Sequence, residues 1–154
     1  MGSIPILRLH NLFNTMPLLS NKGTDTGYTH YLRFTWEDLQ RESWRDSGTS
    51  NDVRKRIAAL KAGDVITYAL FYTAVPSLGP SDMVMTAGTT DTNTAIMNLF
   101  DMDASVAAVN TGTSLTFNRA VLTSNFPIWI RIQGSLENLT TGEWIVALQV
   151  LSPQ

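Results

Sequence analysis

The chain contains no cysteine. This excludes a disulfide framework and a cysteine-ligated zinc site. No apolar run approaches the roughly 18 residues that a membrane-spanning helix needs. The first residues also lack the charged and apolar regions of a secretory signal. We therefore expect a protein that has no membrane partner.

Charge is also scarce. Charged residues make up 16% of the 154 residues, against roughly 25% in a typical soluble domain. Threonine, serine, asparagine and glycine make up the difference. The net charge of -2 argues against nucleic acid binding, which normally requires a basic patch or arm. This composition suits an all-β protein with much of its outer surface in contact with something.

Few residues are suited to catalysis. The chain has two histidines, His10 and His30, and it has no cysteine nucleophile and no Gly-x-Ser-x-Gly elbow. Asp91, Asp101 and Asp103 carry oxygen ligands of the kind that calcium or magnesium prefers, but no EF-hand frame surrounds them. We expect no enzymatic activity, no metal and no cofactor.

The C-terminal region predicts two β-strands joined by a polar turn. In Phe126–Gln133, isoleucine occupies every second position from residue 128, which is typical of a half-buried strand. Glu143–Leu151 is apolar on both faces, because Ile145 and Ala147 lie opposite to Trp144. Such a strand lies either between two sheets or between a sheet and a partner subunit.

Alternating residues and turn signals predict further strands over the rest of the chain: Ile4–Leu9, Tyr28–Trp36, Asp64–Val75, Met83–Thr86, Ala95–Phe100, Ser105–Val109 and Ser114–Leu122. Pro76 is expected to end the strand that begins at Asp64, because proline cannot donate to a ladder. Strands at this spacing hide their inner faces by packing sheet on sheet. We therefore predict an all-β fold, a jelly-roll-type β-sandwich of about eight strands with one or two short helices in its first half.

The two helices are expected between these strands. Thr35 and Asp38 form a weak capping box before a short helix at Trp36–Glu42. Asn51–Gly63 is the best helical candidate, because three apolar residues fall at i, i+4 and i+7: Val53, Ile57 and Leu60. Four basic residues on its other face form either a solvated surface or an anion site: Arg54, Lys55, Arg56 and Lys61.

The N-terminal stretch is apolar and is broken by Pro5 and Pro17. We predict an extended arm at residues 1–20 and a single β-sandwich domain at 21–154. The arm either lies along a neighbouring subunit or forms an ordinary first strand with its loop. The predicted interface residues are Ile4, Ile6, Leu7, Leu9, Leu12 and Phe13 of the arm, together with Trp129 and Arg131, which share the outward face of their strand.

The apolar arm Ile4–Leu19, the strands Val65–Val75 and Ile128–Val150, and the short helix between strands resemble the jelly-roll structural proteins of virus particles. Phage cement and decoration proteins and small capsid or protruding domains belong to this class. The resemblance implies a non-catalytic protein at the capsid surface of the virion. It also implies a homo-oligomer, with a trimer favoured, that binds a capsid shell protein.

Two alternatives stay open. A small capsid shell protein usually carries a tail rich in arginine and lysine that neutralises packaged nucleic acid, and this chain lacks one. A carbohydrate-binding, lectin-like module would instead use an exposed aromatic residue with polar neighbours, such as Trp129 with Gln133.

Overall fold

The computed structural model describes residues 19–20, 29–79, 81–92, 94–103, 109–110 and 122–153. Its elements are β1 (Leu19–Ser20), β2 (His30–Thr35), α2 (Trp36–Gln40), η1 (Glu42–Trp44), β3 (Ser47–Thr49), β4 (Asp52–Leu60), β5 (Val65–Leu78), β6 (Val84–Gly88), β7 (Met97–Asp101), β8 (Val109–Asn110), β9 (Phe126–Gln133), η2 (Leu136–Asn138) and β10 (Thr141–Leu151). The predicted strands at 4–9, 105–109 and 114–122 lie outside the described residues, apart from Val109 and Leu122. The same is true of all six predicted interface residues of the arm.

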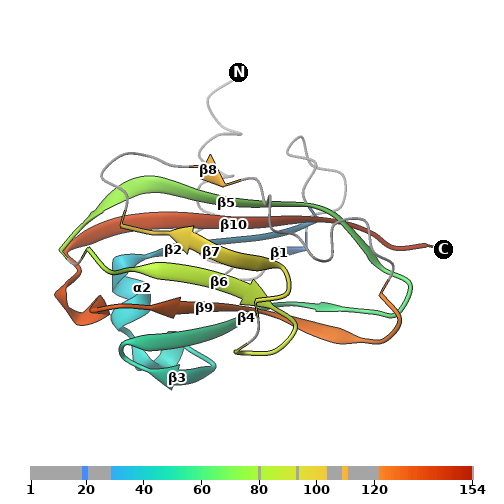
Figure 1. Cartoon of the computed structure of the whole chain (residues 1–154), viewed down its shortest axis with the longest axis horizontal. Coiled ribbons are helices and arrows are strands. Elements are labelled where there is room, and N and C mark those ends of the chain that lie inside the picture. Colours follow the sequence, from blue (N-terminus) through green and yellow to red (C-terminus); the bar gives the residue numbers. More distant parts are fainter. Residues whose placement is uncertain are drawn as a thin grey trace, which may run out of the picture.

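The strands form two antiparallel five-stranded sheets, which pack as two layers (Figure 1). Sheet A has the order β1-β2-β10-β5-β8, and sheet B has the order β3-β4-β9-β6-β7. Of the ten described strands, β1 and β8 have two residues each, which leaves eight longer strands. The predicted all-β sandwich of about eight strands is confirmed.

The strand pairs are nested along the sequence. β2 pairs with β10, β4 with β9, β5 with β8, and β6 with β7, all antiparallel. This nesting arises when one long hairpin is wrapped into two sheets, and it is the topology of a jelly roll. The connection from β9 to β10 therefore crosses from sheet B to sheet A. It is less polar than the sequence indicated, because Leu136 and Leu139 are buried in it.

The prediction of a helix at 51–63 is wrong. Residues 52–60 form β4, which pairs with β3 and β9 in sheet B. The ladder to β9 is irregular between Arg56 and Ala58, so Ile57 is an extra residue and both Ile57 and Ala58 are buried. This bulge shifts the strand's alternation by one position. It therefore places Val53, Ile57 and Leu60 in the core at a spacing that imitates a helix.

The short helix is confirmed as α2, which lies at one end of the sandwich (Figure 1). The backbone N–H of Thr35 donates to Asp38 Oδ2 at 2.9 Å, as a capping box requires. The segment 95–100, which fits either a helix or a strand, contains most of strand β7.

Strand β5 does not end at Pro76 but continues to Leu78. The ladder between β5 and β10 shifts register at this point, between Thr141 and Glu143. Proline is tolerated at such irregular positions because no ladder hydrogen bond is required of it there. The Pro76 carbonyl accepts a hydrogen bond from Thr141 Oγ1 at 3.1 Å.

The core is centred on Trp144 of β10, which is fully buried. Its ring stacks on Phe34 at 5.6 Å between centroids, and Phe34 lies 5.2 Å from Trp44. Trp144 Nε1 donates to the carbonyl of Met102, just after β7, at 3.1 Å. A tryptophan of sheet A is thereby tied to the end of a sheet B strand.

A substitution at Gly142 tests this packing. It adopts φ +136°, and a Cβ atom there would lie 2.4 Å from Cη2 of Trp144. We expect Gly142→Ala to lower the free energy of unfolding by about 2–4 kcal/mol, because it adds backbone strain to overpacking. The urea midpoint measures the change.

Gly63→Ala is the matched control. Gly63 also has a positive φ, +93°, but its added Cβ would meet only Pro153 Cγ at 3.4 Å. We expect this variant to lose clearly less stability than Gly142→Ala. Equal losses would show that backbone strain alone, and not the Trp144 ring, makes Gly142 necessary.

Candidate functional site

Trp129 and Arg131 lie on the outer face of sheet B. Strand β9 buries Ile128, Ile130 and Ile132 and turns the residues between them outward, as its alternation predicts. In the sheet, Trp129 is opposite Arg56 on one side and Gly88 on the other. Trp129 is half-buried. Its proposed contact with a partner stays a prediction.

Arg131 is held by charges within its own sheet. Its Nε and Nη2 donate to the two carboxylate oxygens of Asp52 at 2.8 and 2.9 Å. Asp52 also accepts from Arg54 Nη2 at 2.8 Å, and Arg54 Nη1 donates to Asp91 at 3.0 Å. We call these four residues, Asp52, Arg54, Asp91 and Arg131, the sheet B ion network.

The sheet B ion network fixes a loop to the sheet. Asp91 belongs to the segment between β6 and β7, yet it binds Arg54 on β4 and accepts from Ser47 Oγ on β3 at 3.3 Å. β4 and β6 flank β9 in the sheet, so this loop reaches across the outer face. Sequence reasoning had placed the basic residues on a helix, and it therefore missed this network.

A cleft of about 660 Å³ opens at one end of the sandwich. Its walls come from the start of β2, the turn between β4 and β5, and the C-terminal end of β10. His30, Lys61 and Asp64 bring titratable groups to it, and Leu60 and Val150 add apolar surface. The sequence did not indicate this cleft, because no local pattern links His30 with Lys61 and Asp64.

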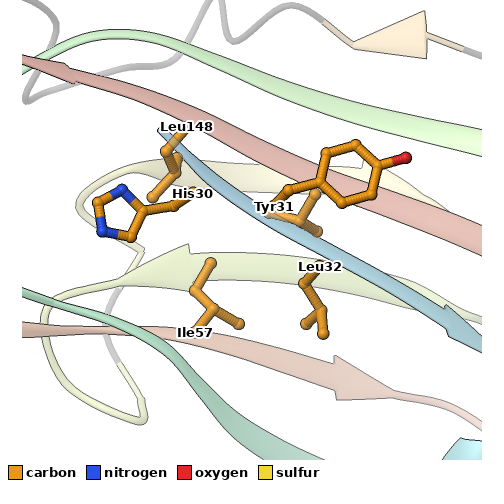
Figure 2. Close-up of a pocket in the computed structure, with 6 residues that line it drawn as sticks. His30, Tyr31, Leu32, Ile57 and Leu148 are labelled. Atoms are coloured by element: carbon orange, nitrogen blue, oxygen red, sulfur yellow. The ribbon is translucent and has the colours of Figure 1, made fainter. Parts of the chain in front are cut away.

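Figure 2 shows His30 at the edge of the space between the sheets, where Leu32 and Leu148 of sheet A approach Ile57 of sheet B. Burial lowers the pKa of His30, although Asp64 acts in the opposite direction. The pKa of Asp64 is lowered, mainly because its carboxylate accepts the Lys61 backbone N–H at 2.8 Å. The folded protein therefore favours a neutral imidazole beside an ionised carboxylate.

Aspartates also gather at a second site, near the ends of β6 and β7. Burial, followed by a hydrogen bond with Asp101, raises the pKa of Asp103. Asp103 also accepts the Met83 N–H at 3.1 Å. Asp91, which the sequence grouped with these two as possible cation ligands, is instead paired with Arg54. Among the described residues, no three or more side chains are arranged to hold a metal ion.

The outer face of sheet A is apolar. Ile145 and Ala147 on β10 are paired with Tyr72 and Leu70 on β5, and all four lie opposite to the core face. Ala147 is fully buried, Ile145, Leu70 and Tyr72 are partly exposed, and Val75 is 43% exposed. The sequence indicated this face, because the strand predicted at 143–151 is apolar on both sides.

An ion pair lies beside this apolar face. Arg33 of β2 and Glu143 of β10 form a salt bridge, with 20% and 15% of their side chains exposed. Tyr31, on the same face of β2, has its pKa raised by burial. Charged and polar groups at the margin of the face are therefore largely shielded from water.

No protein-family model, curated protein or solved structure matches the chain. In the part of the chain that the structure describes, no helix is long and apolar enough to cross a membrane.

Asp52 is the centre of the sheet B ion network, and the hydrogen bonds from Arg131 and then Arg54 hold its pKa well below the usual range. A carboxyl group whose pKa is lowered by folding stabilises the protein fully above about pH 4, the ordinary pKa of an aspartate. This stabilisation is lost as the pH falls below that value. We expect Asp52→Asn to cost about 1–3 kcal/mol at pH 7, because it leaves two guanidinium groups without this carboxylate.

Urea unfolding of the wild type and of Asp52→Asn at pH 7, 4 and 2.5 tests this expectation. The difference between the two proteins should shrink as the pH falls below 4. Glu42→Gln is the control, because the Glu42 side chain is 90% exposed and its pair with Arg45 is long, at 3.8 Å. A difference that stays constant with pH would contradict the role of the Asp52 charge.

Proposed function

We propose that this chain is a structural protein of a virus particle, which stabilises or decorates a capsid shell through contacts between subunits. The observation that carries the proposal is the apolar outer face of sheet A. A two-sheet sandwich has one core between its layers and needs no second apolar surface for folding. The partly exposed Leu70, Tyr72 and Ile145, together with the exposed Val75, place apolar side chains on such a second surface, and large exposed apolar surfaces mark sites of protein contact.

The jelly-roll topology supports this proposal. Viral capsid domains use this fold, but so do lectins and cupins, and the fold alone does not select among them. The net charge of -2 favours a place on the outside of a shell over contact with packaged nucleic acid. A homotrimer that binds a shell protein is the assembly we propose. The contribution of the arm at 1–20 stays a prediction.

A carbohydrate-binding module is the second candidate. It is favoured by Trp129, which is half-buried on the outer face of sheet B, beside polar side chains and opposite Gly88. The glycine leaves no side chain at the position next to the ring. Binding to a glycan array that is lost in Trp129→Ala, but kept in Trp36→Ala, would favour this candidate over the structural one.

Sedimentation tests the structural proposal. We expect the wild-type chain to sediment as a trimer at micromolar concentration. Leu70→Glu should shift it toward the monomer, because burying an unpaired carboxylate in a subunit contact is costly. The far-ultraviolet circular dichroism spectrum and the urea midpoint establish whether Leu70→Glu remains folded, and Leu70→Ser provides a milder variant.

Ala59→Glu is the control, because Ala59 is exposed on β4 of the opposite sheet. It should leave the sedimentation coefficient unchanged. A wild-type chain that remains monomeric at all concentrations and does not bind assembled shells would contradict the proposal. Tight, salt-sensitive binding to DNA or RNA would instead support a shell protein that lines the genome.

A further inference from the structure

The cleft at the end of the sandwich, which we call the end cleft, is bordered by a group of hydrogen bonds around Thr29. These bonds lie outside the proposed subunit contact. Thr29, just before β2, donates its backbone N–H to the Leu148 carbonyl at 2.9 Å. Its Oγ1 donates to the same carbonyl at 3.2 Å and accepts the Val150 N–H at 2.9 Å. Thr29 thus joins the start of β2 to the end of β10, next to the last pair of that ladder, His30 with Leu148.

The same hydroxyl contacts the His30 ring. Thr29 Oγ1 is 3.0 Å from His30 Nδ1, and a hydroxyl has one proton to donate. With that proton donated to the Leu148 carbonyl, the tautomer that completes the contact has its proton on Nδ1. Nε2 of the neutral ring then carries a lone pair, and protonation of His30 takes place there.

His30 lies between two different environments. On one side is a narrow gap lined by Leu32, Ile57, Val146 and Leu148, which has no room for a water molecule. On the other side is the end cleft, which is open to water. An imidazolium is poorly stabilised against four aliphatic side chains, whereas the cleft offers water and the Asp64 carboxylate.

We propose that His30 is a pH-sensitive latch for this end of the sandwich. The neutral ring packs at the gap and holds Thr29 in place. The protonated ring turns into the cleft toward Asp64, and its departure weakens the Thr29 hydrogen bonds that join β2 to β10. This latch is independent of the structural role proposed above.

The charged groups around the ring fit this movement. The turn after β4 places Asp64, which is 7% exposed, and Lys61 in the cleft with His30. Asp64 attracts the imidazolium and Lys61 opposes it, while the residues that face the ring from β4 and β10 are aliphatic. Tyr31 also lines the gap, but its ring points away from the His30 ring, as Figure 2 shows.

The direction of the pH effect follows from burial. Since burial lowers the pKa of His30 in the folded chain, the unfolded chain binds the proton more tightly. The stabilisation by neutral His30 is complete above the ordinary value of about 6.5, and it decreases as pH falls from there through the folded pKa. Asp64, whose pKa is lowered, contributes only to losses below about pH 4.

Proton NMR on the full chain tests the latch. The chain has two histidines, so His10→Gln assigns the remaining signal to His30. We expect His30 to titrate below pH 6.5. Between pH 7 and 5 the protection factor of the Val150 amide, corrected for intrinsic exchange, should fall by up to about tenfold per pH unit, the limit for one proton.

His30→Gln is the decisive variant, because it keeps a neutral polar side chain that cannot be protonated. It should make the protection factor of Val150 independent of pH over this range, while His10→Gln should keep the wild-type fall. Asp64→Asn should lower the His30 pKa further. A fall that is unchanged in His30→Gln, or constant protection of Val150 in the wild type, would overturn the proposal.

Discussion

The packing of Trp144 against Phe34 is the interaction on which the rest of the fold depends. Trp144 lies on β10, which is paired along its length with β2 and β5 in the middle of sheet A. Its indole N–H reaches the Met102 carbonyl, which also accepts Ser77 Oγ at 3.3 Å. One buried side chain therefore packs β10 against β2 in sheet A and joins that sheet to the end of β7.

The alternation of β9 and the two apolar faces of β10 could be predicted from sequence, because each residue there follows the regular period of a strand. The helix predicted at 51–63 failed because the bulge at Ile57 breaks that period and gives helical spacing to core residues. The continuation of β5 past Pro76 depends on a register shift that only the partner strand determines.

The candidate sites were less predictable than the fold. Arg131 was identified as outward-facing, but its pairing with Asp52 joins residues on two strands far apart in sequence. The group of hydrogen bonds around Thr29 likewise depends on Leu148 and Val150, more than a hundred residues away. The two faces of the sandwich also differ. Ion pairs around Asp52 hold the outer surface of sheet B, whereas aliphatic and tyrosine side chains cover that of sheet A, with the Arg33–Glu143 pair at its margin.

Cysteine labelling measures most directly whether the outer face of sheet A is a subunit contact. The chain has no native cysteine, so Ile145→Cys and Ala59→Cys each carry a single thiol, one on each sheet. Maleimide should react with both thiols when the protein is dilute, and only with the Ala59→Cys thiol when it is assembled at high concentration. An Ile145→Cys thiol that reacts equally fast in both states would contradict the account.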